Sequence, residues 1–451
     1  MRTIKTAYVP IGVGTFHLPS AQDLFDRSVA VLSAIAEKRG CELVCPEKML
    51  LSVPDLENYL GTIDPDLIVL QNITFANAAY TQTLMHRFAD RAVLLWTLPE
   101  PVIDGGRLRL NSLTGAFSAG NTMRGYGKND FVYMLGTPEA DAVQKTIFDT
   151  MAAVQLKESL KELKLAQVGH TPQGFGFGRA LDMDMLRVFG VTLESVEVRE
   201  LIKLAKSYSD EDAAADLEDA KKYLVGLENT PEQNVRDFAR LYKAYRAYVT
   251  DSGIKALASR CWPDLFVEYG TPVCAVLSLL NAEGVVASCE SDAYGALSMY
   301  IGAELSGDSV FFGDPVSVSE EENSLTFWHC GMAPCNLARE DTGACVGVHP
   351  NRKIGPTMEF GCKPGDKATV FRVGRTPEGK FRLFIAGGDV MDKPRQFLGT
   401  SIVVHMEHNA KETVLKAVEA GWEPHFVVTY GDIRGELTIL AKMLGIEVEA
   451  F

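Results

Sequence analysis

Two acids and two histidines in the second half of the chain form the residue set best suited to chemistry. They are Glu290, Asp314, His329 and His425, and each stands beside a short apolar run that we expect to be a strand. Moving a proton between two adjacent carbons needs a base, an acid and a group that polarises oxygen. Carboxylates and a divalent metal ion can supply all three. Hard oxygen ligands combined with imidazole favour manganese or magnesium over a thiolate metal, so the set predicts a Mn2+ (or Mg2+) site.

Each of these residues also has an ordinary structural interpretation. A single acid between a strand and a helix, such as Glu290, is often a cap or a surface charge, and Asp314 precedes a proline and can start a turn. His425 can be a hydrogen-bonded core histidine. His329 has cysteines close by and invites a zinc site, but the further soft ligands that zinc would need at close spacing are not evident.

An alternating pattern of strands and helices must position these side chains. In the first part of the chain, β-rich apolar runs at 6–13, 41–46, 66–71, 92–98 and 131–136 are each followed by a helical pattern or a capping residue. A second unit with strands at 191–198 and 285–290 begins at 164. Such alternation predicts parallel sheets covered by helices. From about 305, short β-prone runs separated by Gly, Pro and Asp predict a β-rich, barrel-like domain.

We therefore expect an α/β chain of three domains: two doubly wound parallel-sheet domains, 1–163 and 164–304, and a β-rich C-terminal domain, 305–451, with a terminal helix. The 451 residues exceed the roughly 250–300 at which one hydrophobic core stops growing. Ligands of open α/β sheets collect beyond the carboxyl ends of the strands, and Glu290 stands at such an end. We expect the metal site between the second and third domains.

Composition argues against several kinds of partner. A net charge of −15 and a pI near 5.1 would repel nucleic acid, and no basic run offsets this charge. We find neither a secretory signal pattern nor an uncharged apolar stretch of about 18 residues, so no membrane partner is expected. The nine cysteines, an odd number spread along the chain, fit reduced thiols in the cytoplasm.

Motifs within residues 260–451 carry a family resemblance. The segment that begins Glu290-Ser-Asp-Ala-Tyr-Gly and ends Phe312-Gly-Asp314 resembles the L-fucose isomerase block with a metal-binding Glu and Asp, at the same spacing of 24 residues (314 minus 290). Arg260-Cys-Trp262-Pro-Asp is similar to an Arg-x-Trp-x-Asp element of that family, and His425-Phe-Val-Val-Thr-Tyr-Gly resembles its final ligand histidine. Leu-Thr-Phe-Trp-His329 is closer to the L-arabinose isomerases, where a histidine after the second acid completes a four-ligand set.

The resemblance implies a metal-dependent aldose–ketose isomerase that acts on a monosaccharide through an enediolate. Glu290, Asp314 and His425 would hold the ion, with His329 as the fourth ligand or a partner of the ligands, and the two acids would relay protons. Trp262 would stack on the sugar and Arg260 would bind hydroxyls or an anionic group. The resemblance also implies a homo-oligomer, a trimer or hexamer, in which His17 can enter a site, including that of a neighbouring subunit.

Two other classes of function remain open in the sequence. Tandem α/β lobes also suit a sugar-binding protein without catalysis. The glycine-rich loop at 172–178 follows a strand and would serve a nicotinamide-dependent oxidoreductase, although it lacks the spaced glycine fingerprint, and we expect a mobile loop near the site instead. The sequence does not name the sugar, but Arg124, Arg179 and Arg260 leave room for an anionic hexose, for example a sulfonated one.

Overall fold

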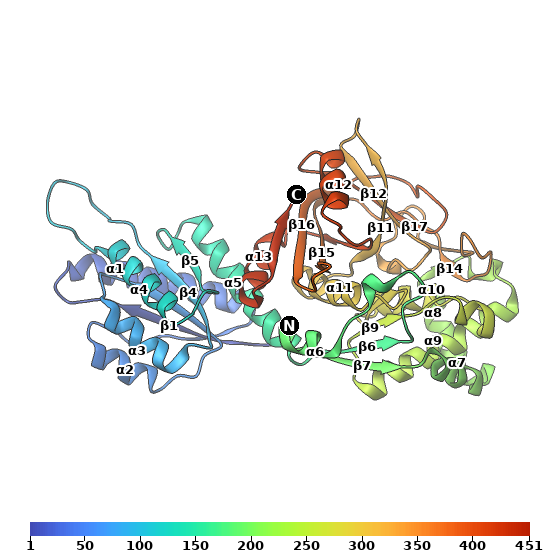
Figure 1. Cartoon of the computed structure of the whole chain (residues 1–451), viewed down its shortest axis with the longest axis horizontal. Coiled ribbons are helices and arrows are strands. Elements are labelled where there is room, and N and C mark those ends of the chain that lie inside the picture. The colour runs from blue at the N-terminus through green and yellow to red at the C-terminus, as the bar shows by residue number, and fades with distance from the viewer. The chain divides into compact units, whose positions relative to one another are not determined.

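The computed structural model describes residues 1–451 and divides them into two compact units (Figure 1). Unit 1 consists of Met1–Ser159 and Gly435–Gly445, and unit 2 consists of Leu160–Arg434 and Ile446–Phe451. The chain is of mixed α/β class, with parallel sheets and a β-rich C-terminal part, as expected. The terminal helix that we expected in the C-terminal domain forms as α13 (Arg434–Leu444) and belongs almost entirely to unit 1.

Unit 1 is built on a five-stranded parallel sheet with the order β2-β1-β3-β4-β5. Its strands overlap the five runs expected from the sequence: β1 (Lys5–Ile11), β2 (Glu42–Val44), β3 (Leu67–Asn72), β4 (Ala92–Thr97) and β5 (Val132–Leu135). Its other helices are α1 (Leu18–Arg39), α2 (Val53–Leu60), α3 (Ala78–Phe88), α4 (Ser112–Gly125) and α5 (Asp141–Leu160).

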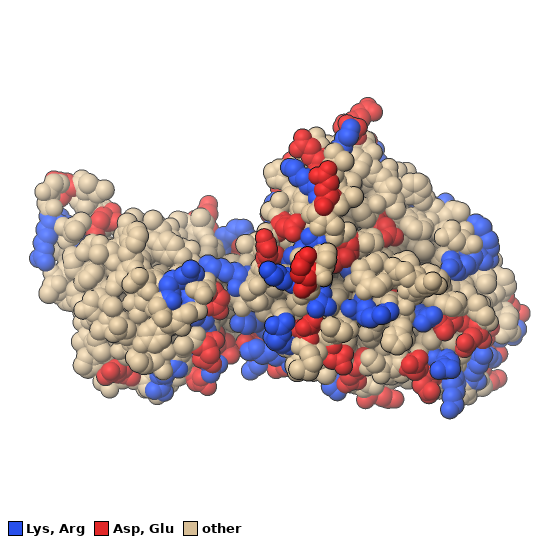
Figure 2. All heavy atoms as spheres, viewed as in Figure 1, with Lys and Arg blue, Asp and Glu red and all other residues tan.

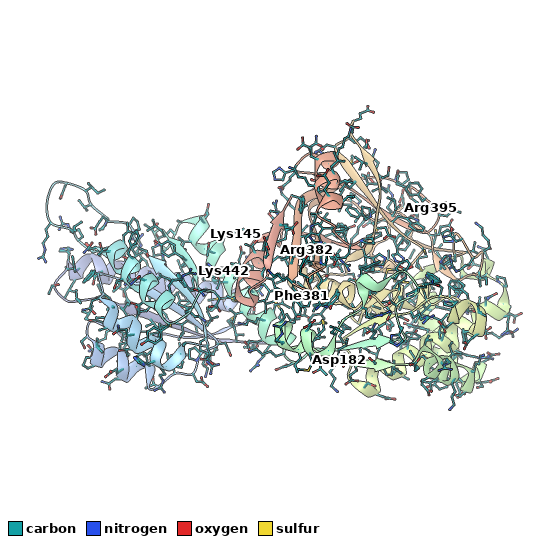
Figure 3. The ribbon with its side chains drawn as sticks, in the orientation of Figure 1. Lys145, Asp182, Phe381, Arg382, Arg395 and Lys442 are labelled. Carbon is teal, nitrogen blue, oxygen red and sulfur yellow. The ribbon has the colours of Figure 1, made fainter.

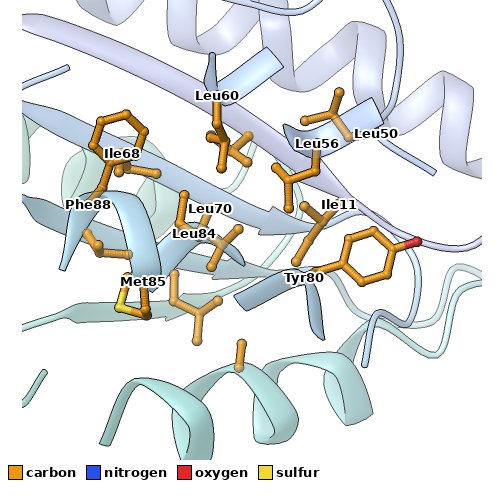
Figure 4. Close-up of a cluster of buried hydrophobic side chains, with 14 of the residues drawn as sticks. Ile11, Leu50, Leu56, Leu60, Ile68, Leu70, Tyr80, Leu84, Met85 and Phe88 are labelled. Atoms are coloured by element: carbon orange, nitrogen blue, oxygen red, sulfur yellow. The ribbon is translucent and has the colours of Figure 1, made fainter. Parts of the chain in front are cut away.

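The core of unit 1 explains why its central strands are mostly apolar. Every residue of β3 is buried, as a parallel strand covered on both faces requires. One cluster of buried side chains from β1, β3, α2, α3 and neighbouring segments packs together, including Ile11, Leu56, Leu60, Ile68, Leu70, Leu84, Met85 and Phe88 (Figure 4).

Helix α13 completes unit 1 by packing on α5. Gly435 lies so close to Asp149 that a Cβ atom at 435 would overlap the carboxylate and come within 3.1 Å of Lys145 Nζ. Figure 3 labels Lys145 on α5 and Lys442 on α13. The Lys442 ammonium in turn lies 5.5 Å from the ring centre of Phe131, so a segment from late in the sequence is part of this unit's packing.

Unit 2 begins with a four-stranded parallel sheet in the order β10-β9-β6-β7. The strands are β6 (Lys164–Val168), β7 (Thr192–Val196), β9 (Ala256–Ser259) and β10 (Val286–Cys289), of which β9 is not among the expected strands. The accompanying helices are α6 (Asp182–Asp184), α7 (Val198–Ser207), α8 (Asp210–Lys221), α9 (Glu232–Ser252), α10 (Cys274–Ala282) and α11 (Ala293–Ser306). Because all four strands are parallel, their carboxyl ends meet at one edge.

The β-rich part of unit 2 is a closed antiparallel barrel of six strands. The order is β15-β18-β11-β12-β17-β16, and pairing of β15 with β16 closes the ring; β19 adds to β16 in parallel. The strands are β11 (Phe311–Ser319), β12 (Ser324–His329), β15 (Gly365–Arg375), β16 (Phe381–Val390), β17 (Thr400–Met406), β18 (Phe426–Tyr430) and β19 (Glu447–Ala450). Helix α12 (Ala410–Glu419) lies between β17 and β18, and β8 (Leu224–Val225), β13 (Ala344–Gly347) and β14 (Thr357–Met358) form a small separate sheet.

The surface carries charges of both signs. On the face shown in Figure 2, basic and acidic side chains are interspersed over both units. The chain as a whole has a net charge of −15. None of the helices combines the length and apolar character that crossing a membrane requires.

Candidate active site

The turn from β10 into α11 places Glu290 at the carboxyl edge of the unit 2 sheet. Glu290 and Ser291 both have left-handed backbone angles, with φ of 58° and 54°. Such angles cost on the order of 1 kcal/mol or more each for residues with a side chain, so the surrounding structure must hold this turn. Asp292 then caps α11 by accepting the N–H of Gly295 at 2.8 Å. The turn leaves the Glu290 side chain 13% exposed at the sheet edge.

His425 reaches the same place from the residue before β18, where its φ is 71°. Its buried ring has a carboxylate near each nitrogen. Nε2 lies 3.0 Å from Glu290 Oε2 and 3.6 Å from Asp314 Oδ1, and Nδ1 lies 3.0 Å from Asp292 Oδ2. Asp314 comes from β11 and is 33% exposed, so one acid of the group faces open space.

The charges of this group support one another. Burial lowers the pKa of His425, but hydrogen bonds to Asp292 and Glu290 outweigh it and raise the pKa to about 10. Burial raises the pKa of Glu290, but His425 outweighs it and leaves this pKa below its usual value. Burial also opposes ionisation of Asp292, yet Arg372 and His425 hold its pKa far below the usual range. Glu290, Asp292 and His425 are therefore charged at neutral pH in the absence of any ligand.

His329, at the end of β12, completes the set. Its ring centre lies 5.7 Å from that of His425, and ligand atoms of Glu290, His329 and His425 all lie within 4.8 Å of one another. Nδ1 accepts the N–H of Cys330 at 2.9 Å, whereas the buried Nε2 has no hydrogen-bond partner. Burial lowers the pKa of His329, which favours the neutral ring. The cysteines that suggested zinc are not part of this group.

A buried ion pair that the sequence reading missed supports the site from behind. Arg372 Nη1 donates to Asp292 Oδ2 at 2.9 Å and to the backbone oxygen of His425 at 2.8 Å, and neither side chain of the pair is more than 1% exposed. The sequence feature that could have revealed this pair is the arginine within the apolar run 369–373. A charge in a buried strand must have a partner of opposite charge. Arg372 thus fixes both Asp292 and the backbone of His425.

Aromatic side chains form a wall around the acids. Trp262 donates its indole N–H to Glu290 Oε1 at 3.3 Å. Phe175 lies 5.9 Å from the Trp262 ring and Phe177 lies 5.4 Å from the His425 ring, measured between ring centres. The glycine-rich loop thus lies at the site, as expected, and its two phenylalanines contact the predicted residues.

Two predicted substrate contacts have other partners in the structure. Arg260 stands beside the site, but its guanidinium is engaged by Asp264 at 2.6 Å and by the backbone oxygen of Trp262 at 3.3 Å. His17 belongs to unit 1, where Nδ1 accepts the N–H of Ser20 and caps α1. Unit 2 by itself therefore brings together Glu290, Asp314, His329, His425 and Trp262, with Arg260 at the margin.

Known proteins resemble the chain along its whole length. No family model matches the chain. A sulfoquinovose isomerase from Clostridium sp. (strain MSTE9) is 57% identical over 451 residues, which cover 100% of both chains, and one from Priestia aryabhattai is 36% identical over 456 aligned positions, again covering both chains in full. Among solved structures, a solute-binding protein from Agrobacterium vitis with bound alpha-D-tagatopyranose aligns over 68% of this chain and 90% of its own, at 15% identity and a TM-score of 0.18. That score is too low to indicate a shared architecture.

Proposed function

Because the chain belongs to the family of the sulfoquinovose isomerases and is an aldose–ketose sugar isomerase, we propose that its substrate is sulfoquinovose, a glucose that carries a sulfonate at C6. The product is the corresponding 2-ketose. The observation that carries the assignment of the site is the convergence of Glu290, Asp314, His329 and His425, which come from four separate segments, around one position.

We assign a divalent ion, manganese or magnesium, to this position. Glu290, Asp314 and His425 would hold it, with His329 as the fourth ligand. Two observations support the fit: hard oxygen donors and imidazole suit these ions, and the buried Nε2 of His329 has no other partner. A ligating Nε2 carries no hydrogen, so the ring hydrogen of His329 would move to Nδ1. Nδ1 would then no longer accept the N–H of Cys330. When bound, the ion polarises the carbonyl and hydroxyl oxygens of the sugar.

The side chains of the site can carry out the proton transfers. We assign to Glu290 the removal of the proton from C2 and its return to C1, because this carboxylate is sheltered from water and held by the Trp262 indole. Asp314, which is more exposed, would move the hydroxyl proton between O2 and O1. The first step yields an enediol intermediate, and protonation at C1 completes the ketose, so no atom is gained or lost.

The aromatic wall serves binding. The faces of Trp262, Phe175 and Phe177 can cover the C–H surface of a sugar and exclude water from the two acids. The two other functions that the sequence left open, a sugar receptor and a nicotinamide oxidoreductase, are not favoured, because the full-length relatives are isomerases. The homo-oligomer stays a prediction, and the mass of the particle in solution would test it. The cytoplasmic location and the place of His17 near a site stay predictions as well.

The test is solvent exchange at the carbon-bound position. Metal-loaded protein is mixed with sulfoquinovose in D2O, and NMR follows both ketose formation and deuterium entry at C2 of the recovered aldose. We expect both signals, their loss on chelation, and their return with Mn2+. Folded, metal-replete protein that produces neither signal would contradict the proposed function, and a change in nicotinamide absorbance with added cofactor would favour the oxidoreductase instead.

A further inference from the structure

Arg352 is a cation without a counter-ion at the rim of the candidate active site. Its guanidinium carbon lies 5.2 Å from the ring centre of Trp262 and 5.2 Å from that of Phe266. The side chain is half-buried, yet no hydrogen bond or ion pair to any residue of the chain engages its guanidinium. Stacking on two rings holds the guanidinium in place through its faces. The N–H donors in the plane of the guanidinium stay free to bind a ligand.

The turn that carries Arg352 is built to hold it there. His349 is buried, and its Nδ1 accepts the backbone N–H groups of Asn351 and Arg352 at 3.3 and 3.4 Å. The ring of His349 packs edge-on against Phe266, with 5.0 Å between ring centres. Burial and the charge of Arg352 lower the pKa of His349 to about 4, so the ring stays neutral and keeps accepting at neutral pH. The backbone of the turn is thus fixed against one of the rings on which Arg352 stacks.

Two other arginines near the site are already paired with acids. Arg260 is engaged by Asp264, and Arg372 is buried against Asp292. Arg352 differs because the same indole that donates to Glu290 with its N–H offers its face to the guanidinium. Trp262 therefore spans from the acid that acts at C1 and C2 to a free cation, and a sugar lying along the indole would present its other end to Arg352.

We propose that Arg352 is the residue that binds the sulfonate of the substrate and so selects the sulfonated sugar over neutral hexoses. This inference rests on the proposed function for the choice of substrate. A sulfonate offers three acceptor oxygens and a full negative charge, which match the fork of an arginine better than the point charge of a lysine. Arg352 is a binding residue in this assignment and takes no part in the proton transfers.

The test compares Arg352→Gln and Arg352→Lys with wild-type protein. The binding probe is the alditol obtained by reducing sulfoquinovose, which keeps the sulfonate but cannot isomerise. Because charge-assisted hydrogen bonds are the strong ones, we expect Arg352→Gln to weaken its binding by about 10- to 100-fold and Arg352→Lys to recover part of the loss. The KM for sulfoquinovose should rise by a similar factor, with kcat within about threefold. Activity toward 6-deoxy-D-glucose, which lacks the sulfonate, should be as weak in the variant as in wild type.

A neighbouring charge provides the control. Lys353 is exposed and next in sequence, and Lys353→Gln removes the same charge without touching either ring. Equal losses in Lys353→Gln and Arg352→Gln would overturn the assignment in favour of a general positive field, and unchanged binding in Arg352→Gln would overturn it outright. Thermal unfolding shows whether each variant is folded. Turnover of sulfoquinovose by wild type judges the proposed function separately; wild-type protein that neither binds the alditol nor turns over the sugar would overturn both.

Discussion

Asp292 fixes the orientation of His425 from behind the site. Its Oδ2 lies 3.0 Å from Nδ1 of the imidazole, and each side chain is 1% exposed. A histidine that donates Nδ1–H to a carboxylate keeps Nε2 for a ligand on the opposite side, and Nε2 is the atom that faces Glu290 and Asp314. Asp292 is thus a positioning residue, and Arg372 keeps it ionised.

Substitution of Asp292 by Asn should weaken metal binding without removing the helix cap. Asparagine caps a helix as well as aspartate does, but it leaves Arg372 without its charge partner. Metal affinity should fall by about 10- to 100-fold, as for other partners of ligating histidines. The free energy of unfolding should fall by about 3 kcal/mol, because an unpaired buried charge remains. Metal titration and urea unfolding measure the two effects, and unchanged metal affinity would contradict the positioning role.

Replacing each of the two acids by its isosteric amide should distinguish their roles in the reaction. Glu290→Gln and Asp314→Asn should each lower kcat by at least about 100-fold, the loss typical of a positioned acid or base. Glu290→Gln should abolish deuterium entry at C2, which reports the carbon-bound proton alone. Metal content has to be measured on the same samples. A Glu290→Gln variant that holds its metal and keeps wild-type turnover would show that Glu290 is not the base.

Metal binding should be tighter at higher pH. In the metal-free protein, the pKa of His425 is raised from 6.5 to about 10, so the ring is doubly protonated at neutral pH and must lose the Nε2 proton to bind an ion. Each ion bound should release about one proton, and the apparent affinity should rise by up to about tenfold per pH unit until pH approaches 10. Calorimetry in buffers of different ionisation enthalpy counts the protons. Binding that does not depend on pH between 7 and 9 would exclude His425 as a ligand.

The metal-free protein should show the matching dependence of stability. A pKa raised on folding means that the charged ring of His425 stabilises the fold. This contribution is complete below about pH 6.5, the unfolded value, and is lost as pH rises through about 10. Thermal unfolding in the presence of a chelator should therefore show a falling midpoint from pH 7 to pH 10. Asp292→Asn should flatten this slope, because it removes one of the two hydrogen bonds that raise the pKa.

A methyl group at Gly178 should displace the aromatic loop. A Cβ there would lie 2.8 Å from the backbone Cα of Asp292, which cannot move aside because it caps α11. Gly178→Ala should shift Phe177 away from His425 and lower kcat/KM by about 10- to 100-fold, the cost of a displacement near 1 Å at a reacting centre. Gly176→Ala is the matched control, since a Cβ at that position meets nothing within 4 Å. Equal rates in the two variants would contradict the role of the loop.

Residue type and spacing were enough to find the acids and histidines that meet at one point. Glu290, His329 and His425 each stand where a strand begins or ends, and Asp314 follows the apolar start of β11. The structure brings the four together. The partners of these residues could not be found in this way. Asp292 meets Arg372 across 80 positions (372 minus 292), and that pairing depends on where β15 lies relative to α11.

One barrel strand and two arginines show other limits of the sequence. Strand β16 contains two adjacent glycines, which weaken the strand signal, but pairing with β15 and β17 stabilises it. Arg260 lies at the site, yet an aspartate four residues later engages its charge, and spacing alone does not reveal which partner prevails. Arg352, in contrast, has no acidic partner. The sequence cannot show this, because it becomes evident only when the positions of all neighbouring side chains are known.

The division of the chain has a consequence for how the protein is made. Unit 1 takes its last helix from Gly435–Gly445, so the chain passes between the units at 159–160, 434–435 and 445–446. While unit 2 is being translated, the sheet of unit 1 has already been synthesised but lacks α13. The surface of α5 around Asp149 is therefore uncovered during this time. Final assembly of unit 1 therefore requires residues 435–445 to have been synthesised, and a nascent chain arrested before residue 435 should remain a client of chaperones.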